Sequence, residues 1–390
     1  MTPQARVQAA IEVLDAVIAA ARSRGAPADR ILSDWFRPRR FAGSKDRRAV
    51  RELVYAAIRR CGEVPASGRA ALLLLAGDDP AIAALFDGSR HAPEPIRSDE
   101  PVAAPGIAPL WLEQALAASG LDAGEQQALL GRAPLDIRIN SLKAGLADLP
   151  EEGERGAAPR ARRYPPSTPV EQWAAYQAGA IEVQDMGSQL VCEAVAARAG
   201  EAVVDLCAGA GGKTLALAAA MDDAGILLAC DADRARLSRL GPRAERAGVH
   251  IAETRLLDPG REAEALADWQ GGADAVLVDA PCSGTGTWRR NPEARWRLTA
   301  QELARLVALQ ARLLDVGAAL VRPGGRLVHV VCSLLDAEGA GQVEAFLARH
   351  PNWRAAPLAL GAGRPRGAGL RLTPAHDGTD GFFVARLERL

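Results

Sequence analysis

The sequence predicts an α/β protein in three parts: an all-α region at residues 1–90, a small α+β region at 107–180, and a doubly wound, mostly parallel sheet at 181–390. Three observations lead to this prediction. Apolar residues recur at helical spacing before residue 90. From Ile181 onward, short apolar segments alternate with helical patterns, which is typical of parallel strands joined by crossover helices. Several of those segments end in aspartate, at the edge where such sheets bind ligands.

The N-terminal helices carry a run of cations. We expect Ser44 to cap the second helix, whose apolar stripe includes Val50 and Val54. The cations, which we call the basic segment, are Arg37, Arg39, Arg40, Lys45, Arg47, Arg48 and Arg51. They form either an ordinary solvated helix face or a patch for RNA phosphates, with Trp35, Phe36 and Phe41 as packing or stacking groups.

The middle of the chain has fewer regular patterns. Residues 88–106 carry four prolines among polar residues and are predicted to be a linker. A helix is expected from Pro109, and residues 136–140 alternate like a strand. Residues 151–169, which are rich in Gly, Pro and Arg, are expected to form an exposed loop or a loose hairpin. Their arginines are a second candidate RNA contact.

The C-terminal half follows the pattern of alternating strands and helices. The segment Ala202–Asp205 starts the sheet, and Gly381–Leu387 is expected to pair at its edge. Long helices are expected at Ala232–Ala247 and Thr299–Ala319. The other predicted strands are Ile226–Cys230, Ile251–Leu256, Ala275–Val278 and Arg326–Val331.

Bulk composition excludes several classes. The net charge of −1 over 390 residues argues against an overall basic nucleic-acid binder, although a local basic face remains compatible with it. No apolar run is long enough to span a bilayer, and the N-terminus lacks a signal-peptide core, so we expect a cytoplasmic protein without a membrane partner. The six cysteines form no C-x-x-C pair, which argues against a metal site.

The segment Cys207–Thr214 is a glycine-rich turn between a strand and a helix. A phosphate-binding P-loop would need glycine where Cys207 stands, and a dinucleotide fingerprint would need it where Thr214 stands. The turn therefore suits a nucleoside-like ligand, and S-adenosylmethionine is the obvious candidate. A glycine-rich turn without any ligand is the alternative interpretation of this segment alone.

Four aspartates fall at predicted strand ends. One such aspartate is explained by helix capping, but four in this arrangement favour a binding site. Asp231 could accept both ribose hydroxyls of a nucleoside, and Asp258 could reach an adenine edge. Asp279 could lie between cofactor and substrate. The fourth is Asp205.

Two cysteines follow predicted strands directly. Cys282 lies in Ala280–Thr287 after Asp279, and Cys332 follows Val331. If the two strands are neighbours, both thiols face one pocket. Methylation at cytosine C5 needs such an arrangement, because C5 becomes nucleophilic only after a thiolate adds to C6. A second thiol can assist the final elimination, and a nearby cation would favour the thiolate.

These residues also carry a family resemblance. The segments Asp205–Thr214, Asp279–Gly286 and Val331–Ser333 resemble the motifs of the RsmB/Sun-type (NOL1/NOP2/Sun) RNA cytosine-5 methyltransferases. Residues 184–189, 289–296 and 380–383 are similar to further segments of that family. The resemblance covers residues 180–390 strongly and 107–180 moderately. It implies a Rossmann-like class I methyltransferase domain, and it relates residues 1–90 to a shortened NusB-like RNA-binding domain.

The resemblance also implies residue roles. Cys332 matches the nucleophile, and Cys282 matches the cysteine that helps to release the product. The S-adenosylmethionine contacts would be Cys207, Ala208, Gly209, Ala210, Gly211, Gly212, Lys213, Asp231, Asp258 and Asp279. The residues alone do not assign attacker and releaser, and DNA cytosine-5 methyltransferases attack with the thiol that corresponds to Cys282. The chain departs from the family at Gly209–Ala210, where Ala-Pro is usual, and at Val331, where Thr is frequent.

The combined interpretation is an S-adenosylmethionine-dependent RNA cytosine-C5 methyltransferase. Its expected substrate is 16S ribosomal RNA, with transfer RNA as the alternative, and a monomer is expected. A non-catalytic RNA-binding assembly factor is the alternative from another class, which the intact pair Cys282 and Cys332 argues against. A nicotinamide dehydrogenase is disfavoured by Thr214 at the third glycine position of the fingerprint.

Overall fold

The computed structural model describes residues 1–23 and 25–390, and its contacts divide them into two units. Unit 1 comprises Met1–Gly131 and Thr287–Thr299, and unit 2 comprises Arg132–Gly286 and Ala300–Leu390. These boundaries differ from the three predicted parts, because residues 107–131 and the segment after the Cys282 loop group with the N-terminal helices. The three-part division stays a prediction. Among the described residues, no helix is both long and apolar enough to cross a membrane.

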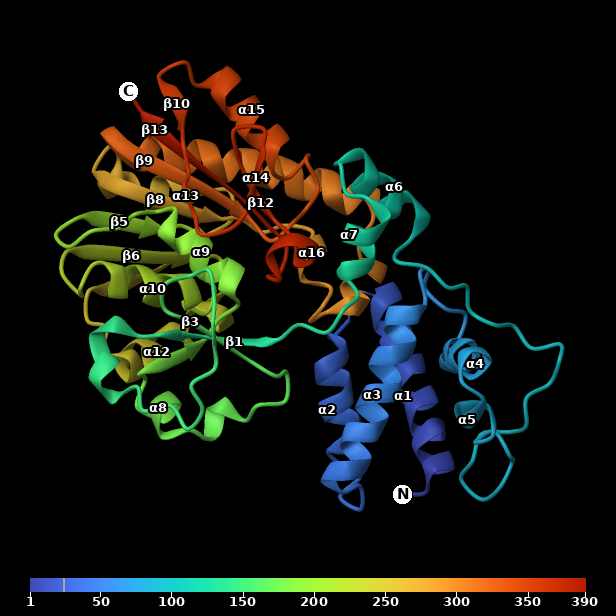
Figure 1. The fold of residues 1–390 in the computed structure, drawn as a ribbon. Helices are drawn as coiled ribbons and strands as arrows, with labels where there is room; N and C mark the ends of the chain where they lie inside the picture. The colour runs from blue at the N-terminus through green and yellow to red at the C-terminus, as the bar shows by residue number, and fades with distance from the viewer. Residues whose placement is uncertain (24) are drawn as a thin grey trace. The chain divides into compact units, whose positions relative to one another are not determined.

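Unit 1 is helical, as the periodicity of its sequence predicted (Figure 1). Its α1, α3 and α4 pack around a core that includes Leu14, Val54 and Leu72, all fully buried. The proposed cap at Ser44 was wrong: Ser44 is already helical, and Gly43 is the cap residue, with its N–H bonded to Asp46. The helices are α1 Pro3–Ser23, α2 Ala28–Phe36, α3 Ser44–Arg60, α4 Gly68–Asp78, α5 Pro80–Ala83, α6 Leu110–Ala118 and α7 Ala123–Ala128.

The segment Thr287–Thr299 completes unit 1. It contains a 3-10 turn, η5 Pro292–Trp296, whose Arg295 side chain is fully buried. That guanidinium donates to the carbonyls of Ile58 at 2.6 Å and Cys61 at 2.8 Å, which are unpaired carbonyls at the end of α3. Arg295 is therefore a structural residue of unit 1.

Unit 2 begins with a small antiparallel sheet of order β2-β3-β1-β4. Residues 151–169 form its β2–β3 hairpin, but Tyr164 is buried and Arg163 pairs with Asp136 at 2.7 Å, so Arg163 is not the exposed RNA contact that we expected. The elements are β1 Leu135–Ile139, η1 Ser141–Leu146, β2 Glu154–Arg155, β3 Ala161–Tyr164, η2 Val170–Gln172, α8 Ala174–Gln177 and β4 Ile181–Val183.

The large sheet of unit 2 has the order β11-β12-β13-β9-β8-β5-β6-β7, with β10 also paired to β13 (Figure 1). The strands β7, β6, β5, β8 and β9 are parallel, and β13 joins β9 antiparallel. The strands are β5 Ala202–Asp205, β6 Ile226–Asp231, β7 Ala252–Leu256, β8 Ala273–Asp279, β9 Val321–Val331, β10 Trp353–Ala356, β11 Arg364–Arg366, β12 Gly369–Leu372 and β13 Phe382–Arg389.

Helices cover both faces of this sheet. Successive residues of a strand point to opposite faces, so Val203 packs in one core with Leu215 of α10 and Val204 packs in another with Leu314 of α14. The helices are α9 Met186–Glu193, α10 Gly212–Ala220, α11 Arg234–Leu237, α12 Leu240–Ala247, α13 Glu262–Ala265, η3 Ala267–Trp269, α14 Ala300–Leu320, α15 Ala340–Arg349 and α16 Pro374–Asp377.

Two predictions about unit 2 were wrong. The strand at the C-terminus does not end the sheet, because β13 pairs with β9, β10 and β12, and Phe382–Ala385 are buried. The expected helix Ala232–Ala247 is two helices, α11 and α12. Pro242 explains the break, because proline lacks an N–H and is tolerated only in a first helical turn, which is where α12 places it.

Candidate active site

The two predicted reactive thiols lie next to each other. Strands β8 and β9 are parallel neighbours, with Asp279 opposite Val330, so the loops that follow them leave the same edge of the sheet. The Sγ atoms of Cys282 and Cys332 are 3.4 Å apart, and both residues are half-buried. The pKa of Cys282 lies well above its ordinary value because its thiol shares a hydrogen bond with Cys332 and because it is buried. The predicted convergence of the two thiols is confirmed.

Three other cysteines have no such setting. Cys61, Cys192 and Cys230 are buried, and burial raises their pKa values to about 11, 12 and 12. A thiol with such a pKa stays protonated at neutral pH and is a poor nucleophile. These cysteines act as small apolar side chains.

The glycine-rich turn joins β5 to α10 at the same edge. Gly209 and Gly211 adopt φ values of +56° and +85°, and Gly211 directly precedes α10. A Cβ atom on Gly211 would lie 2.1 Å from Leu240 Cδ1, so both conformation and space require glycine. The Gly209 N–H donates to Asp231 at 2.7 Å, which ties the turn to the end of β6. The turn thus packs closely against Leu240 and Arg236 and is followed directly by the N-terminus of α10, whose free N–H groups can serve a ligand.

Carboxyl groups gather around this turn. Asp205 is fully buried, accepts a hydrogen bond from Thr214 Oγ1 at 2.7 Å, and has its pKa raised by burial to about 7. Its other oxygen has no partner among the described residues. Burial, together with the charges of Asp279, Asp205 and Asp231, raises the pKa of Cys207. Asp258 is exposed beyond β7, and no described hydrogen bond links it to this group.

Lys213 links the turn to the thiols. Its Nζ lies 2.7 Å from Asp279 Oδ2 and 5.8 Å from the centre of the Phe382 ring. Burial alone would lower the pKa of Lys213, but Asp279 outweighs it and the pKa is raised. Lys213 thus puts a cation beside Asp279 at the end of β8, three residues before Cys282. The cation that thiolate chemistry needs is therefore present.

Sequence reasoning missed the residues that support the two thiols. Ser283, Ser333 and Glu338 form a hydrogen-bonded group beside the cysteines, in which Ser333 and Glu338 are fully buried. Glu338 precedes α15 and has no catalytic motif around it, so nothing in the pattern distinguished it from a surface glutamate. Its burial was the only signal, and burial becomes known only with the fold.

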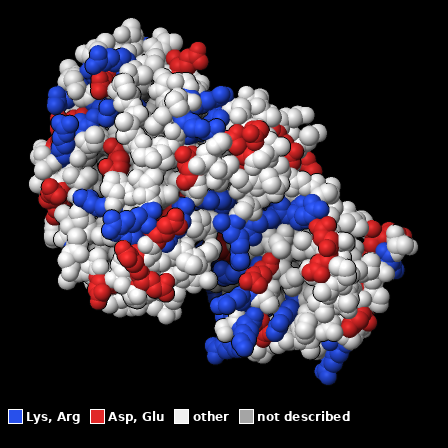
Figure 2. Space-filling model, in the orientation of Figure 1, with Lys and Arg blue, Asp and Glu red and all other residues white. Residues whose placement is uncertain are grey.

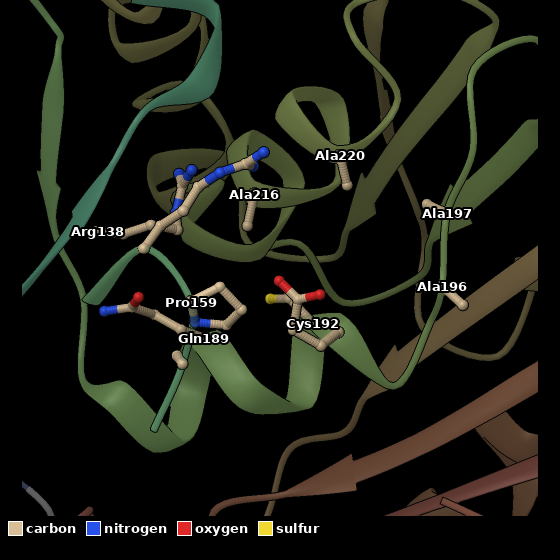
Figure 3. A pocket seen from close by; sticks show the side chains of 11 residues that line it. Arg138, Pro159, Gln189, Cys192, Ala196, Ala197, Ala216 and Ala220 are labelled. Atoms are coloured by element: carbon tan, nitrogen blue, oxygen red, sulfur yellow. The ribbon is translucent and has the colours of Figure 1, made fainter. Parts of the chain in front are cut away.

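Unit 2 also contains a small cavity away from these residues. It has a volume of about 60 Å³ and is lined by α9, α10 and the small sheet, with Arg138, Gln189 and Cys192 among its lining residues (Figure 3). None of the predicted site residues lines it. A space of this size holds a water molecule or two, which the unpaired Gln189 Oε1 could bind.

The basic segment lies on α3 and the turn between α2 and α3, and Figure 2 shows Lys and Arg side chains gathered in unit 1. Arg37 pairs with Asp34, and the Arg39 guanidinium stacks 3.8 Å from the Trp35 ring centre. Phe36 is buried, so it packs, whereas Phe41 is 73% exposed. Among the described residues, the exposed side chains of Arg40, Lys45 and Arg48 form no hydrogen bond or ion pair.

Comparison with known sequences finds a family match that lies mostly in unit 2. A family model described as 16S rRNA methyltransferase RsmB/F matches residues 193–388. Ribosomal RNA small subunit methyltransferase B of Xylella fastidiosa (strain 9a5c) is 37% identical over 295 residues, covering 72% of this chain and 68% of that protein. The protein of the same name from Thermus thermophilus is 39% identical over 223 residues, covering 55% and 52%. The chain therefore spans about half to two thirds of the length of these relatives.

Solved structures show the same fold. The protein PH0851 superposes with a TM-score of 0.74 at 23% identity, covering all of this chain and 99% of that one. A methyltransferase homologue from Pyrococcus horikoshii superposes with a TM-score of 0.61 at 24% identity, covering 72% and 99%. The predicted Rossmann-like methyltransferase fold is confirmed.

Proposed function

Because the chain belongs to the 16S rRNA methyltransferase RsmB/F family, we propose that it transfers a methyl group from S-adenosylmethionine to C5 of a cytosine in RNA. The observation that carries the proposal is the 3.4 Å separation of the Cys282 and Cys332 sulfurs at the edge of the sheet where the glycine-rich turn also lies. S-adenosylmethionine is the methyl donor, and it supplies an electrophilic sulfonium methyl group when bound.

The turn fits this donor. The N–H groups at the start of α10 offer donors to a nucleoside-like molecule, and the tight turn that Gly209 and Gly211 allow keeps the backbone of this segment compact. Asp231 would hold the ribose, although its two oxygens already accept the N–H groups of Gly209 and Asp233. Each carboxylate oxygen has a further lone pair for a hydroxyl. Asp258 would lie at the adenine edge. The other contacts that we propose are Cys207, Ala208, Ala210, Gly212, Lys213 and Asp279.

The chemistry then follows from the two thiols. The Cys332 thiolate forms a bond to C6, and the electrons displaced from the C5–C6 double bond make C5 nucleophilic. C5 takes the methyl group, a base removes the C5 proton, and the C6–S bond breaks as the double bond returns. Cys282 lies close enough to assist that release.

The RNA would contact cations outside the thiol site. Arg40, Lys45 and Arg48 of the basic segment are exposed, and they suit the phosphates of a polyanion, with Phe41 as a stacking group. The name of the family favours 16S ribosomal RNA as substrate. Transfer RNA remains the alternative.

Incubation with labelled S-adenosylmethionine tests the proposal. We expect label in 16S RNA as 5-methylcytosine, located by bisulfite sequencing of RNA from cells with and without the protein. Label in transfer RNA alone would change the proposed substrate and leave the proposed reaction unaltered. Label at a position other than C5, or no transfer to any RNA, would contradict the proposal.

A further inference from the structure

A buried acidic side chain contacts both cysteine-bearing loops. Glu338 lies between β9 and α15 and is fully buried. Its Oε1 accepts the Ser283 N–H at 2.8 Å and Gln310 Nε2 at 3.0 Å. Its Oε2 accepts the hydroxyls of Ser283 and Ser333, the latter at 2.5 Å. Four donors therefore converge on one carboxyl group.

Three of the four donor groups belong to serines that directly follow a reactive cysteine. Ser283 follows Cys282, and Ser333 follows Cys332. Gln310 of α14 also donates to the carbonyl of Pro281 at 2.9 Å, so the residues on both sides of Cys282 are held. A separate bond, from the Gly286 N–H to the Cys332 carbonyl at 3.0 Å, joins the same two loops. The side chain of Glu338 thus holds two loops that the chain order separates by fifty residues.

Stability alone does not explain such a group. Taking a carboxyl group out of water costs free energy that its hydrogen bonds offset only in part, and apolar packing often stabilises as well or better. What the group does provide is fixed geometry, because each oxygen has two donors and little freedom to move. Fixed geometry matters most for groups that hold reacting atoms, because the rate of a reaction depends steeply on how those atoms are placed.

We propose that Glu338 is a positioning residue that sets the separation and orientation of the Cys282 and Cys332 sulfurs through Ser283 and Ser333. The inference rests on the proposed two-thiol chemistry. It assigns a role in that chemistry to a residue that touches neither the cofactor turn nor, in the proposed mechanism, the cytosine.

Disulfide formation reads out this geometry without RNA or cofactor. Diamide takes up two hydrogens while it oxidises two nearby thiols, and peptide mass spectrometry identifies the Cys282–Cys332 link. Glu338→Ala should slow the reaction about tenfold, because misplaced sulfurs meet less often. Loss of the Glu338 charge alone would speed disulfide formation, because this charge adds to the raised pKa of Cys282. The larger causes of that raised pKa are the hydrogen bond with Cys332 and burial. Slower disulfide formation in Glu338→Ala would therefore report a changed arrangement of the two sulfurs.

Two variants serve as controls. Glu338→Gln keeps an acceptor for Ser283 N–H and Gln310, and its amide can donate to both hydroxyls. Because it keeps the geometry and loses only the charge, it should react at least as fast as the natural protein. Asp274→Ala removes another partly buried carboxylate, which accepts the Ala202 N–H at 2.8 Å at the opposite end of β8. It should not change the rate. If Glu338→Ala does not fold, Ser283→Ala combined with Ser333→Ala replaces it, with the same slowing expected.

Turnover gives the second measurement. Glu338→Ala should lower kcat about 10²-fold and leave KM for RNA nearly unchanged, whereas Glu338→Gln should recover most of kcat. A folded Glu338→Ala protein that forms the disulfide and turns over at the natural rate, with only a lower Tm, would overturn the inference. A natural protein that forms the disulfide quickly but methylates nothing would refute the proposed function alone.

Discussion

The two-thiol site of unit 2 and the basic segment of unit 1 use polar side chains in opposite ways. Around Cys282 and Cys332, polar groups bond to one another: Lys213 to Asp279, and Glu338 to two serines. In the basic segment, by contrast, the side chains of Arg40, Lys45 and Arg48 are exposed and bond to no described residue. Paired and buried groups keep one geometry, which bond making needs. Exposed, unpaired cations remain available to a polyanion, which binding needs.

The largest expected effect is on the thiols themselves. Cys332→Ala should lower methyl transfer by at least about 10⁴-fold, because the covalent step is lost. Cys282→Ala should instead leave a protein–RNA adduct that survives a denaturing gel. The matched control is Cys61→Ala, which removes a buried thiol of unit 1 and should form no adduct. An adduct with Cys332→Ala would reverse the two roles.

The Lys213–Asp279 pair tests whether the site depends on its internal charges. Lys213→Met keeps the length of the side chain and removes the ammonium, so kcat should fall about 10²-fold or more through loss of electrostatic support. Asp279→Asn added to it should cost less than the two single changes together, because the partners lie 2.7 Å apart. Strictly additive losses in kcat would show that the pair does not act as a unit.

His329 tests whether water is excluded from the buried region around Glu338. It is fully buried in β9, its Nε2 lies 2.9 Å from the Glu338 carbonyl, and burial lowers its pKa to about 4. Between the unfolded value near 6.5 and this value, the unfolded chain binds a proton that the folded chain does not. The free energy of unfolding should therefore fall as the pH falls through this range, by about 3 kcal/mol in total.

Urea unfolding at several pH values measures this dependence as a difference between the natural protein and His329→Gln. The difference is needed because Asp205, whose pKa burial raises to about 7, titrates over the same range with the opposite sign. Alanine changes in the basic segment should leave the pH dependence unaltered. Equal pH dependence with and without His329 would mean that the ring is hydrated.

The smallest expected effect is on RNA affinity. Changing Arg40, Lys45 and Arg48 together to Ala should weaken binding about tenfold near 0.1 M salt and reduce the slope of log K against log salt by about 2. Turnover at saturating RNA should be unchanged. The control removes three exposed arginines that already pair with Glu264, Glu302 and Glu388, namely Arg261, Arg305 and Arg354. Equal salt slopes in both variants would argue against a specific role for the basic segment.

Much of the site could be predicted because its parts are local. The β-branched Val203 and Val204 indicated a strand covered on both faces, and the glycines indicated the tight turn that follows. The parallel pairing of β8 and β9 then brought Cys282 and Cys332 together as predicted. The place of β13 could not be predicted, because a strand's apolar pattern shows that it is buried and not how many strands lie beyond it.

By itself, the sequence determined the type of fold, the glycine-rich turn and the two cysteines at strand ends, since these follow from propensity and period within short segments. Only the tertiary structure decided that Thr287–Thr299 belongs with the N-terminal helices and that Glu338 is a buried link between the cysteine loops. The physical reason is that burial and hydrogen-bond partners are properties of residues far apart in the chain. No local pattern records which distant donors a single carboxyl group will meet.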